Sequence, residues 1–196
     1  KINGKEITTL YSGVGDGILQ SILNGSTTIT KITIPKSVTS IGEAAFLGCS
    51  SLTSINIPSS VATIGTYVFN SCSSLTSVNI PNSVTSIGKG TFTGCTSLTS
   101  INIPDSVASI GDYAFRGCNS LTSINIPNGV TSIIQGTFTD CTNLKIYCEE
   151  GSYAETYAQT NGIPVIYTDI KAEIIDNIMK DSLEITEDYS NTHYNM

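Results

Sequence analysis

Six cysteines and one histidine are the side chains of this sequence best suited to nucleophilic chemistry or to holding a transition metal. A catalytic thiol or hydroxyl needs a base beside it, and zinc needs cysteine and histidine ligands at short spacings. His193 stands three residues from the end, without a credible cysteine or serine partner. No histidine lies near the cysteines in the rest of the sequence. Carboxylates are sparse, and no phosphate-binding glycine motif occurs. We therefore expect a protein that is not an enzyme and needs no metal or cofactor.

The spacing of the cysteines suggests a structural role. Five of them recur at a step of 23 residues, each three residues after a phenylalanine and three before a leucine: Cys49, Cys72, Cys95, Cys118 and Cys141. A reduced cysteine packs as a small hydrophobic residue, so we interpret the five as a buried ladder. A disulfide framework is the alternative. Cys148 falls outside the period, and we expect it to be the cysteine that is exposed or paired.

The element that must position these cysteines is a 23-residue unit with the text I-P-x-S-V-x-x-I-G-x-x-x-F-x-x-C-x-x-L-T-S-I-N. A fixed period of this length is the signature of a solenoid. In the second unit, alternation predicts a strand at Ser54–Ile57, which Pro58 ends. Gly65 permits a bend, and we expect Thr66–Asn70 to form a helical or 3₁₀ turn on the opposite side. The same elements are predicted in every unit: 29–51, 52–74, 75–97, 98–120 and 121–143.

The sequence predicts four parts: an N-terminal cap at 1–28, five repeats at 29–143, a C-terminal cap at 144–168 and an acidic tail at 169–196. In the first cap we expect a short helix at Asp16–Asn24. In the second we expect a helix at Ser152–Thr160, with a capping box formed by Ser152 and Glu155, and then a strand at Ile163–Tyr167. Isoleucines at helical spacing predict another short helix at Asp169–Met179.

Composition narrows the classes of partner. The net charge is −7, and the last 28 residues carry seven of the acidic groups against two lysines. An acidic chain without basic clusters is a poor candidate for nucleic-acid binding. No apolar run is long enough to span a membrane, and no signal peptide is visible at Lys1. We expect a monomer.

Two rows of polar residues are the first candidate binding surface. In four of the expected strands a serine and an asparagine flank the inward residue: Ser54 and Asn56, Ser77 and Asn79, Ser100 and Asn102, Ser123 and Asn125. Parallel rows of hydroxyls and amides could recognise a glycan or an extended peptide. The alternative is that these side chains satisfy one another and only solubilise the sheet.

The second candidate surface lies on the turns, where residue types vary between repeats. Tyr67 and Tyr113, two repeats apart, together with Arg116, are candidate anchors because tyrosine and arginine are enriched in binding hot spots. The alternative is ordinary variation of a surface.

The repeat text resembles the BspA-like leucine-rich repeats of bacterial surface proteins over residues 29–168. Thr142–Tyr167 also resembles the terminal cap of that family. The resemblance implies an α/β-type leucine-rich-repeat solenoid, right-handed, at the cell surface or secreted. It also implies adhesion to host matrix proteins such as fibronectin or fibrinogen. In the fifth repeat Ile134 replaces the usual glycine and Gly129 the usual serine, which puts the bend there in question.

Three functions remain open from the sequence. The first is a surface protein that adheres to a host or neighbour-cell protein, or to a glycan, through the solenoid surface. The second is a structural spacer within a larger bacterial surface protein. The third is that flat threonine and serine ladders order water or bind ice.

Overall fold

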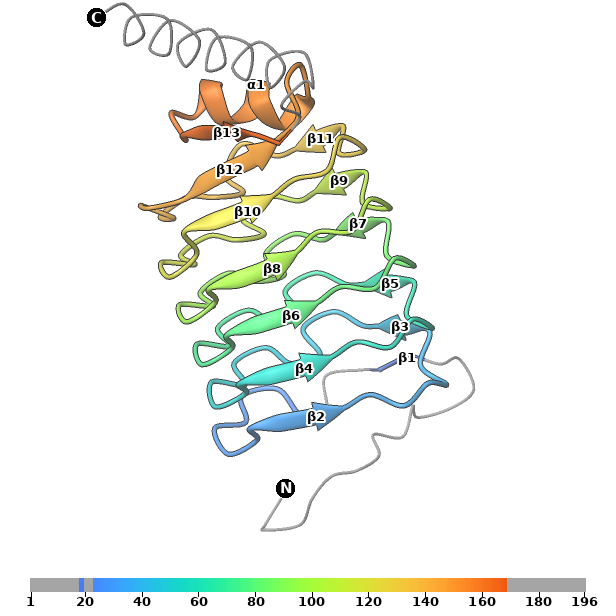
Figure 1. Ribbon diagram of the computed structural model, residues 1–196. Helices are drawn as coiled ribbons and strands as arrows, with labels where there is room; N and C mark the ends of the chain where they lie inside the picture. Colours follow the sequence, from blue (N-terminus) through green and yellow to red (C-terminus); the bar gives the residue numbers. More distant parts are fainter. Residues whose placement is uncertain (1–17, 20–22, 169–196) are drawn as a thin grey trace, which may run out of the picture.

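The computed structural model of the protein describes residues 18–19 and 23–168. They form a solenoid of about six turns of about 23 residues, whose strands stack in parallel along one axis (Figure 1). The expected solenoid and its period are thus confirmed. The count of five repeats and the assignment of two caps stay predictions, and the helix expected at Asp169–Met179 lies outside the described residues.

One parallel sheet runs the length of the solenoid. Its order is β13-β12-β10-β8-β6-β4-β2. Neighbouring strands align residue for residue, so that Ser54 pairs with Ser77 and Asn56 with Asn79. The strands are β2 (Lys31–Thr33), β4 (Ser54–Asn56), β6 (Ser77–Asn79), β8 (Ser100–Asn102), β10 (Ser123–Asn125), β12 (Lys145–Cys148) and β13 (Val165–Tyr167).

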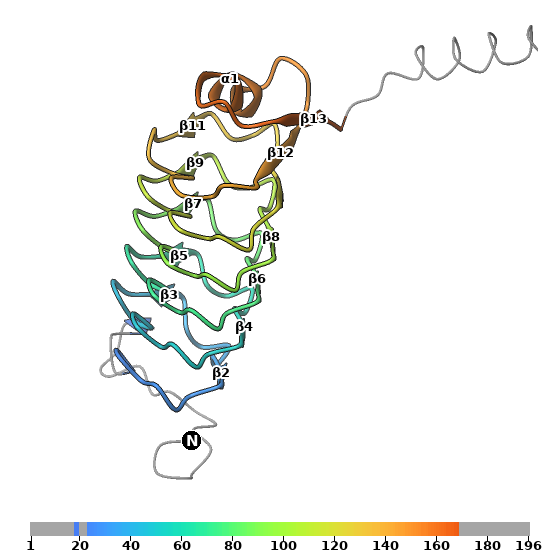
Figure 2. The ribbon, with the colours of Figure 1, turned by 90° about the vertical axis from the view of Figure 1, so that its left-hand side faces the viewer.

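A second set of two-residue strands lies on the opposite side of the solenoid (Figure 2). It forms two short parallel sheets, β1-β3-β5 and β11-β9-β7. The strands are β1 (Ile18–Leu19), β3 (Ser40–Ile41), β5 (Thr63–Ile64), β7 (Ser86–Ile87), β9 (Ser109–Ile110) and β11 (Ser132–Ile133).

The helix expected at Asp16–Asn24 is wrong where the structure describes it. Ile18 and Leu19 form β1, which pairs in parallel with Ser40 and Ile41 of β3. Leu23–Gly25 is a turn, and the amide of Gly25 donates to the carbonyl of Leu47. A partner strand one turn away therefore takes the backbone hydrogen bonds that a local helix would have made.

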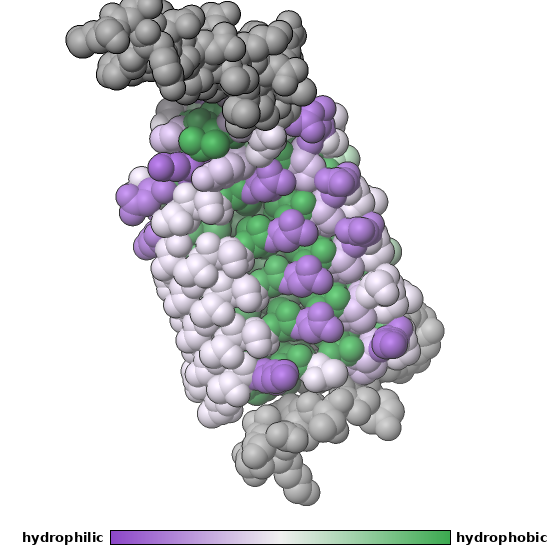
Figure 3. Space-filling model, in the orientation of Figure 1, coloured by the Kyte–Doolittle hydropathy of each residue, from purple (hydrophilic) through white to green (hydrophobic). Residues whose placement is uncertain are grey.

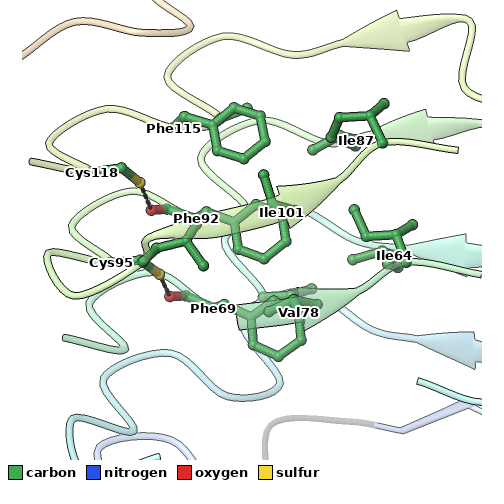
Figure 4. Close-up of a cluster of buried hydrophobic side chains, with 14 of the residues drawn as sticks. Ile64, Phe69, Val78, Ile87, Phe92, Cys95, Ile101, Phe115 and Cys118 are labelled. Carbon is green, nitrogen blue, oxygen red and sulfur yellow. Dashed lines mark hydrogen bonds between the residues drawn. The ribbon is translucent and has the colours of Figure 1, made fainter. Parts of the chain in front are cut away.

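The core between the two strand sets consists of columns of residues at equivalent repeat positions (Figure 4). Each turn contributes one phenylalanine, and the rings of Phe46, Phe69, Phe92, Phe115 and Phe138 stack with centroids 5.3–5.5 Å apart and planes within 16° of parallel. Such a separation is typical of offset stacking. Leucine, isoleucine and valine columns surround the rings and are almost fully buried. Each turn thus packs its apolar side chains against their counterparts in the next.

The segment that follows the second strand set in each repeat is not the helical or 3₁₀ turn that the sequence predicted. In the second repeat it is a run of turns in which Tyr67 has a φ of 56° and Ser71 a φ of 61°. Backbone amides there donate forward to the following repeat, as Phe69 N does to the carbonyl of Thr91 at 2.8 Å. A helix keeps such bonds inside one segment, and left-handed residues interrupt it. Bonding between turns therefore replaces the helix.

The fifth repeat keeps its bend although Ile134 stands where the earlier repeats have glycine. The amide of Ile134 donates to the carbonyl of Ile110 at 3.1 Å, as Gly111 does to Ile87 at 2.8 Å, and β11 still forms. The Ile134 side chain is 46% exposed. In the turn that follows, Gly136 lacks the positive φ found at Gly90 and Tyr113. The backbone of the fifth turn thus adopts a different conformation from the earlier turns and accommodates the side chain of Ile134.

The C-terminal segment agrees closely with the sequence. The helix α1 (Tyr153–Thr160) begins after Ser152, whose hydroxyl accepts from the amide of Glu155 at 3.2 Å. The carboxylate of Glu155 accepts from Gly151 N rather than from Ser152 N, so the capping box is displaced by one residue. Tyr157 of α1 meets the last ring of the stack, Phe138, edge-on at 6.0 Å. The helix therefore covers the end of the phenylalanine column.

Gly111→Ala should destabilise the fold by about 1–3 kcal/mol, the usual cost of overpacking. A β-carbon at Gly111 would lie 2.7 Å from the backbone nitrogen of Lys89, which cannot move aside. Ile134→Ala, at the equivalent place in the fifth turn, is the matched control and should change stability by less than half as much. Urea unfolding measures both, and equal losses would contradict the close approach of neighbouring turns.

Tyr157→Ala should cost about 3 kcal/mol, because it removes a buried ring from the end of the stack. Tyr157→Phe keeps the ring and loses the bond from its hydroxyl to the carbonyl of Gln135, so it should cost about 1 kcal/mol. Equal costs would show that the hydroxyl, not coverage of the stack, is what α1 contributes.

Candidate binding surface

The cysteine ladder is a packing feature. All six cysteines lie in the described part of the chain, none is in a disulfide, and Cys49, Cys72, Cys95 and Cys118 are buried. Each ladder thiol donates to a backbone carbonyl 26 residues earlier, as Cys95 does to Phe69 and Cys118 to Phe92, both at 3.2 Å (Figure 4). The prediction for Cys148 is wrong: it is buried, and Cys141 is the partly exposed one.

Burial also makes these thiols unreactive. It raises the pKa of Cys72 to about 12, with a smaller contribution from the neighbouring Cys49 thiol. Burial likewise raises the pKa of Cys141 to about 11 and moves those of Cys95 and Cys118 upward. The thiolate is the nucleophile and the metal ligand, so protonated thiols have neither role at neutral pH.

The other groups suited to chemistry are not gathered into a site. Within residues 18–19 and 23–168, no three histidine, cysteine, aspartate or glutamate side chains lie close enough to share a metal ion. In the same residues no helix has the length and apolar character needed to cross a bilayer. His193 lies outside the described residues. The candidate functional features are therefore surfaces.

The serines and asparagines predicted as the first surface form two straight rows on the outer side of the main sheet. We call them the Ser/Asn face: Ser54, Ser77, Ser100 and Ser123 in one row, Asn56, Asn79, Asn102 and Asn125 in the other. All eight are exposed, and the inward residue between each pair is buried. Neighbouring strands lie about 4.8 Å apart, which sets the distance between rungs. Lys31 precedes the serine row and Lys145 follows it.

Hydrogen bonding separates this face from the hydroxyls that flank it along the chain. Those hydroxyls bond to the preceding turn: Thr76 donates to the carbonyl of Thr53 at 3.2 Å, and Ser60 to that of Val38 at 2.7 Å. Among the described residues, no side chain of the Ser/Asn face makes a hydrogen bond within the protein. The structure thus gives no support to the interpretation that these side chains satisfy one another. Their hydrogen-bond donors and acceptors are free to bind a ligand or water.

The asparagine row stands between two shallow hollows with apolar floors. Figure 3 shows the row of hydrophilic residues with hydrophobic surface on both sides. One hollow lies between the two rows, over Val78 and Ile101. The other, which we call the asparagine groove, has Asn56, Asn79 and Asn102 on one side, Lys36, Ser59 and Asn82 on the other, and Ile57, Pro58, Ile80 and Pro81 as its floor. Sequence alternation predicted the row but not the hollows, because the apolar floor belongs to residues counted as core.

The tyrosines of the second candidate surface lie against glycines. A β-carbon on Gly136 would come within 2.6 Å of the Tyr113 ring, and Gly90 is equally close to the ring of Tyr67. Each glycine stands 23 residues after its tyrosine, a signal that the sequence offered and that we did not use. Tyr67 is consequently only partly exposed. Both rings thus pack on the next turn.

Tyr113 is the more accessible of the two, at 37% exposure. Cations of its own chain approach the ring: Lys89 Nζ lies 6.0 Å and Arg116 Cζ 5.5 Å from its centroid. Arg116 also pairs with Asp140 at 3.3 Å and Lys89 with Asp112 at 3.6 Å. Exposed ion pairs of this kind contribute little to stability. Tyr113 and Arg116 already contact each other, so their role in binding a partner stays a prediction.

The comparison with known families decides the identity of the repeat. The model of the BspA type leucine rich repeat region matches in six copies over residues 17–145. The chain belongs to the BspA-type leucine-rich repeat family. A search of curated proteins finds no significant match.

Three solved structures of leucine-rich repeat proteins are similar to this chain. A leucine rich cell surface protein from Faecalibacterium prausnitzii A2-165 is 36% identical over 71% of this chain and 36% of its own, with a TM-score of 0.62. A leucine-rich repeat protein from Bacteroides ovatus ATCC 8483 is 38% identical over 69% of this chain and 40% of its own, with a TM-score of 0.59. The leucine rich repeat protein of T. pallidum is 32% identical over 66% of this chain and 62% of its own, with a TM-score of 0.62. The chain therefore spans less than two thirds of the length of each.

Native protein should expose at most one thiol to an aromatic disulfide reagent at pH 8, and six after denaturation in guanidinium. Cys141 should be the residue that reacts, because it is the only cysteine that is not buried, and it should react slowly because its pKa is raised to about 11. The Cys141→Ala variant is the control and should leave native protein without a reacting thiol. Rapid modification of several native thiols, or thiols that appear only after reduction, would contradict a reduced and buried ladder.

Proposed function

We propose that this chain is a non-catalytic binding module that works outside the bacterial cell. It attaches to a macromolecule of a host or neighbouring cell, a protein or a glycan, through the Ser/Asn face. Membership in the BspA-type family supports a binding role, and one structural relative is a leucine rich cell surface protein. The long regular face supports it further, because solenoids use such surfaces for binding.

A single observation carries the choice of face. The Ser/Asn face has eight exposed side chains in register that make no hydrogen bonds within the described protein, whereas neighbouring hydroxyls donate to the preceding turn. Unused donors and acceptors on a rigid sheet lose little conformational freedom on binding. The Tyr113 side chain, by contrast, already contacts Lys89 and Arg116.

A structural spacer is the second candidate function. It is favoured by the repetition itself and by the relatives, of whose length this chain covers between 36% and 62%. As a spacer, the array would hold another part of a longer protein away from the cell, and its Ser/Asn face would only be hydrated.

Asn79→Arg should abolish binding to whichever matrix protein, cell or glycan the wild-type chain retains on an immobilised panel. A long charged side chain at the centre of the face blocks both hollows beside it. We expect a loss of more than tenfold in apparent affinity, measured by surface plasmon resonance.

Thr63→Arg is the matched control, because Thr63 is also exposed in a strand but belongs to β5 on the other side of the solenoid. It should bind as wild type does. Loss of binding in Tyr113→Ala, with Asn79→Arg unaffected, would move the site to the turns. A wild-type chain that binds nothing on the panel would contradict the binding function and favour the structural spacer.

A further inference from the structure

We propose that the asparagine groove binds a linear, uncharged polysaccharide laid along the solenoid axis. The inference rests on the proposed function and names the class of ligand for its surface. Four properties of the groove support this proposal: an asparagine at every rung of one side, a single charged residue in the lining, an apolar floor and a position inside the sheet.

The first property is repetition. Asn56, Asn79 and Asn102 are direct neighbours in the parallel register, about 4.8 Å apart. Each amide presents one acceptor oxygen and two donor hydrogens. A ligand that meets the same group at every rung must itself repeat. A polysaccharide presents the same hydroxyls on each unit, whereas the varied side chains of a protein would find no pocket here that distinguishes one from another.

The position of the groove argues against a peptide bound through its main chain. Peptides join a sheet by hydrogen bonding to an exposed edge strand. The groove lies over β4, β6 and β8, which are inner strands with partners on both sides. Their backbone groups already bond to neighbouring strands, so only side chains face a ligand.

Charge selects a neutral polymer over an acidic one. Lys36, at one end of the groove, is the only charged residue among those that line it. The serine and asparagine rows carry no charge, and most of the net charge of −7 belongs to residues 169–196, outside the described part of the chain. Apart from that one lysine, the groove therefore offers a polyanion no charge with which to pair.

The apolar floor of the groove suits the C–H face of a sugar ring. Pro58 is partly exposed beside the asparagines, and the buried Pro81, Ile57 and Ile80 show only their outermost atoms on the floor. The C–H face of a pyranose ring can pack on this narrow apolar strip while the ring hydroxyls reach the amides. Binding sites generally combine an apolar lining with a few placed polar groups in this way.

The expected binding is weak at each rung and grows with chain length. Among the described residues that line the groove none is aromatic, so no ring supplies a strong stacking contact. Linked weak contacts add through a high effective concentration. The asparagine row continues past the groove to Asn125, which pairs with Asn102. Affinity should rise until the ligand spans the four asparagines of the row, about 15 Å at the spacing of parallel strands, and then level off.

Affinity electrophoresis of the full chain in native gels containing mannan, xylan, hydroxyethylcellulose or a soluble β-1,3-glucan tests the proposal, because the method detects weak binding. At least one neutral polymer should retard the wild type. Asn79→Ala/Asn102→Ala should weaken that retardation at least fivefold, since each lost hydrogen bond accounts for about a two- to tenfold change. Oligosaccharides of the same polymer should compete better as they lengthen to span the asparagine row, and the hexasaccharide should therefore compete better than the disaccharide.

Thr63→Ala/Ser86→Ala removes two exposed hydroxyls from the second strand set and should bind as wild type does. Thermal unfolding confirms that both double variants fold. Retardation by alginate but by no neutral polymer would overturn the proposal, as would equal competition by disaccharide and hexasaccharide. A protein ligand that Asn79→Arg blocks, with no polysaccharide bound, would overturn this proposal and leave the proposed function standing. The absence of both kinds of ligand would overturn both.

Discussion

Backbone hydrogen bonds between residues 23 positions apart hold this protein together. The step brings each residue beside its counterpart in the next turn, in both strand sets and in the turns between them. Each turn therefore depends on its neighbours, and no turn has a core of its own. An insertion of one residue in a strand would move the side chains that follow it in that strand to the opposite face of the sheet.

The same constraint explains why residues suited to chemistry serve packing instead. A cysteine repeated at the step becomes a column between phenylalanine and leucine columns, and its thiol donates to a carbonyl of the preceding repeat. Burial then raises the thiol pKa values. A tyrosine on the turn needs a glycine one step later, as Tyr113 has in Gly136, because the ring lies over the next turn. Departures from the repeat are thus coupled across turns.

Repetition also limits what the surface can recognise. A conventional binding site gathers different side chains around one ligand, whereas the Ser/Asn face offers the same two groups on four successive strands. Such a face suits a ligand with its own regular repeat, and its strength comes from the number of rungs engaged. The two ends of the serine row differ from its middle, because Lys31 pairs with the first serine and Lys145 with the last. The uncharged stretch of the face therefore has a defined length.

The sequence by itself determined the period, the inward columns, the strands that carry serine and asparagine, and α1 with its cap at Ser152. Alternation and capping are local patterns and report reliably on local structure. Only the tertiary structure decided the rest. It put Ile18–Leu19 in a strand, replaced the expected helical turns with bonds to the next repeat, buried Cys148 and left the Ser/Asn side chains without partners in the described protein. These outcomes depend on which backbone group lies one turn away, and a single repeat does not contain that information.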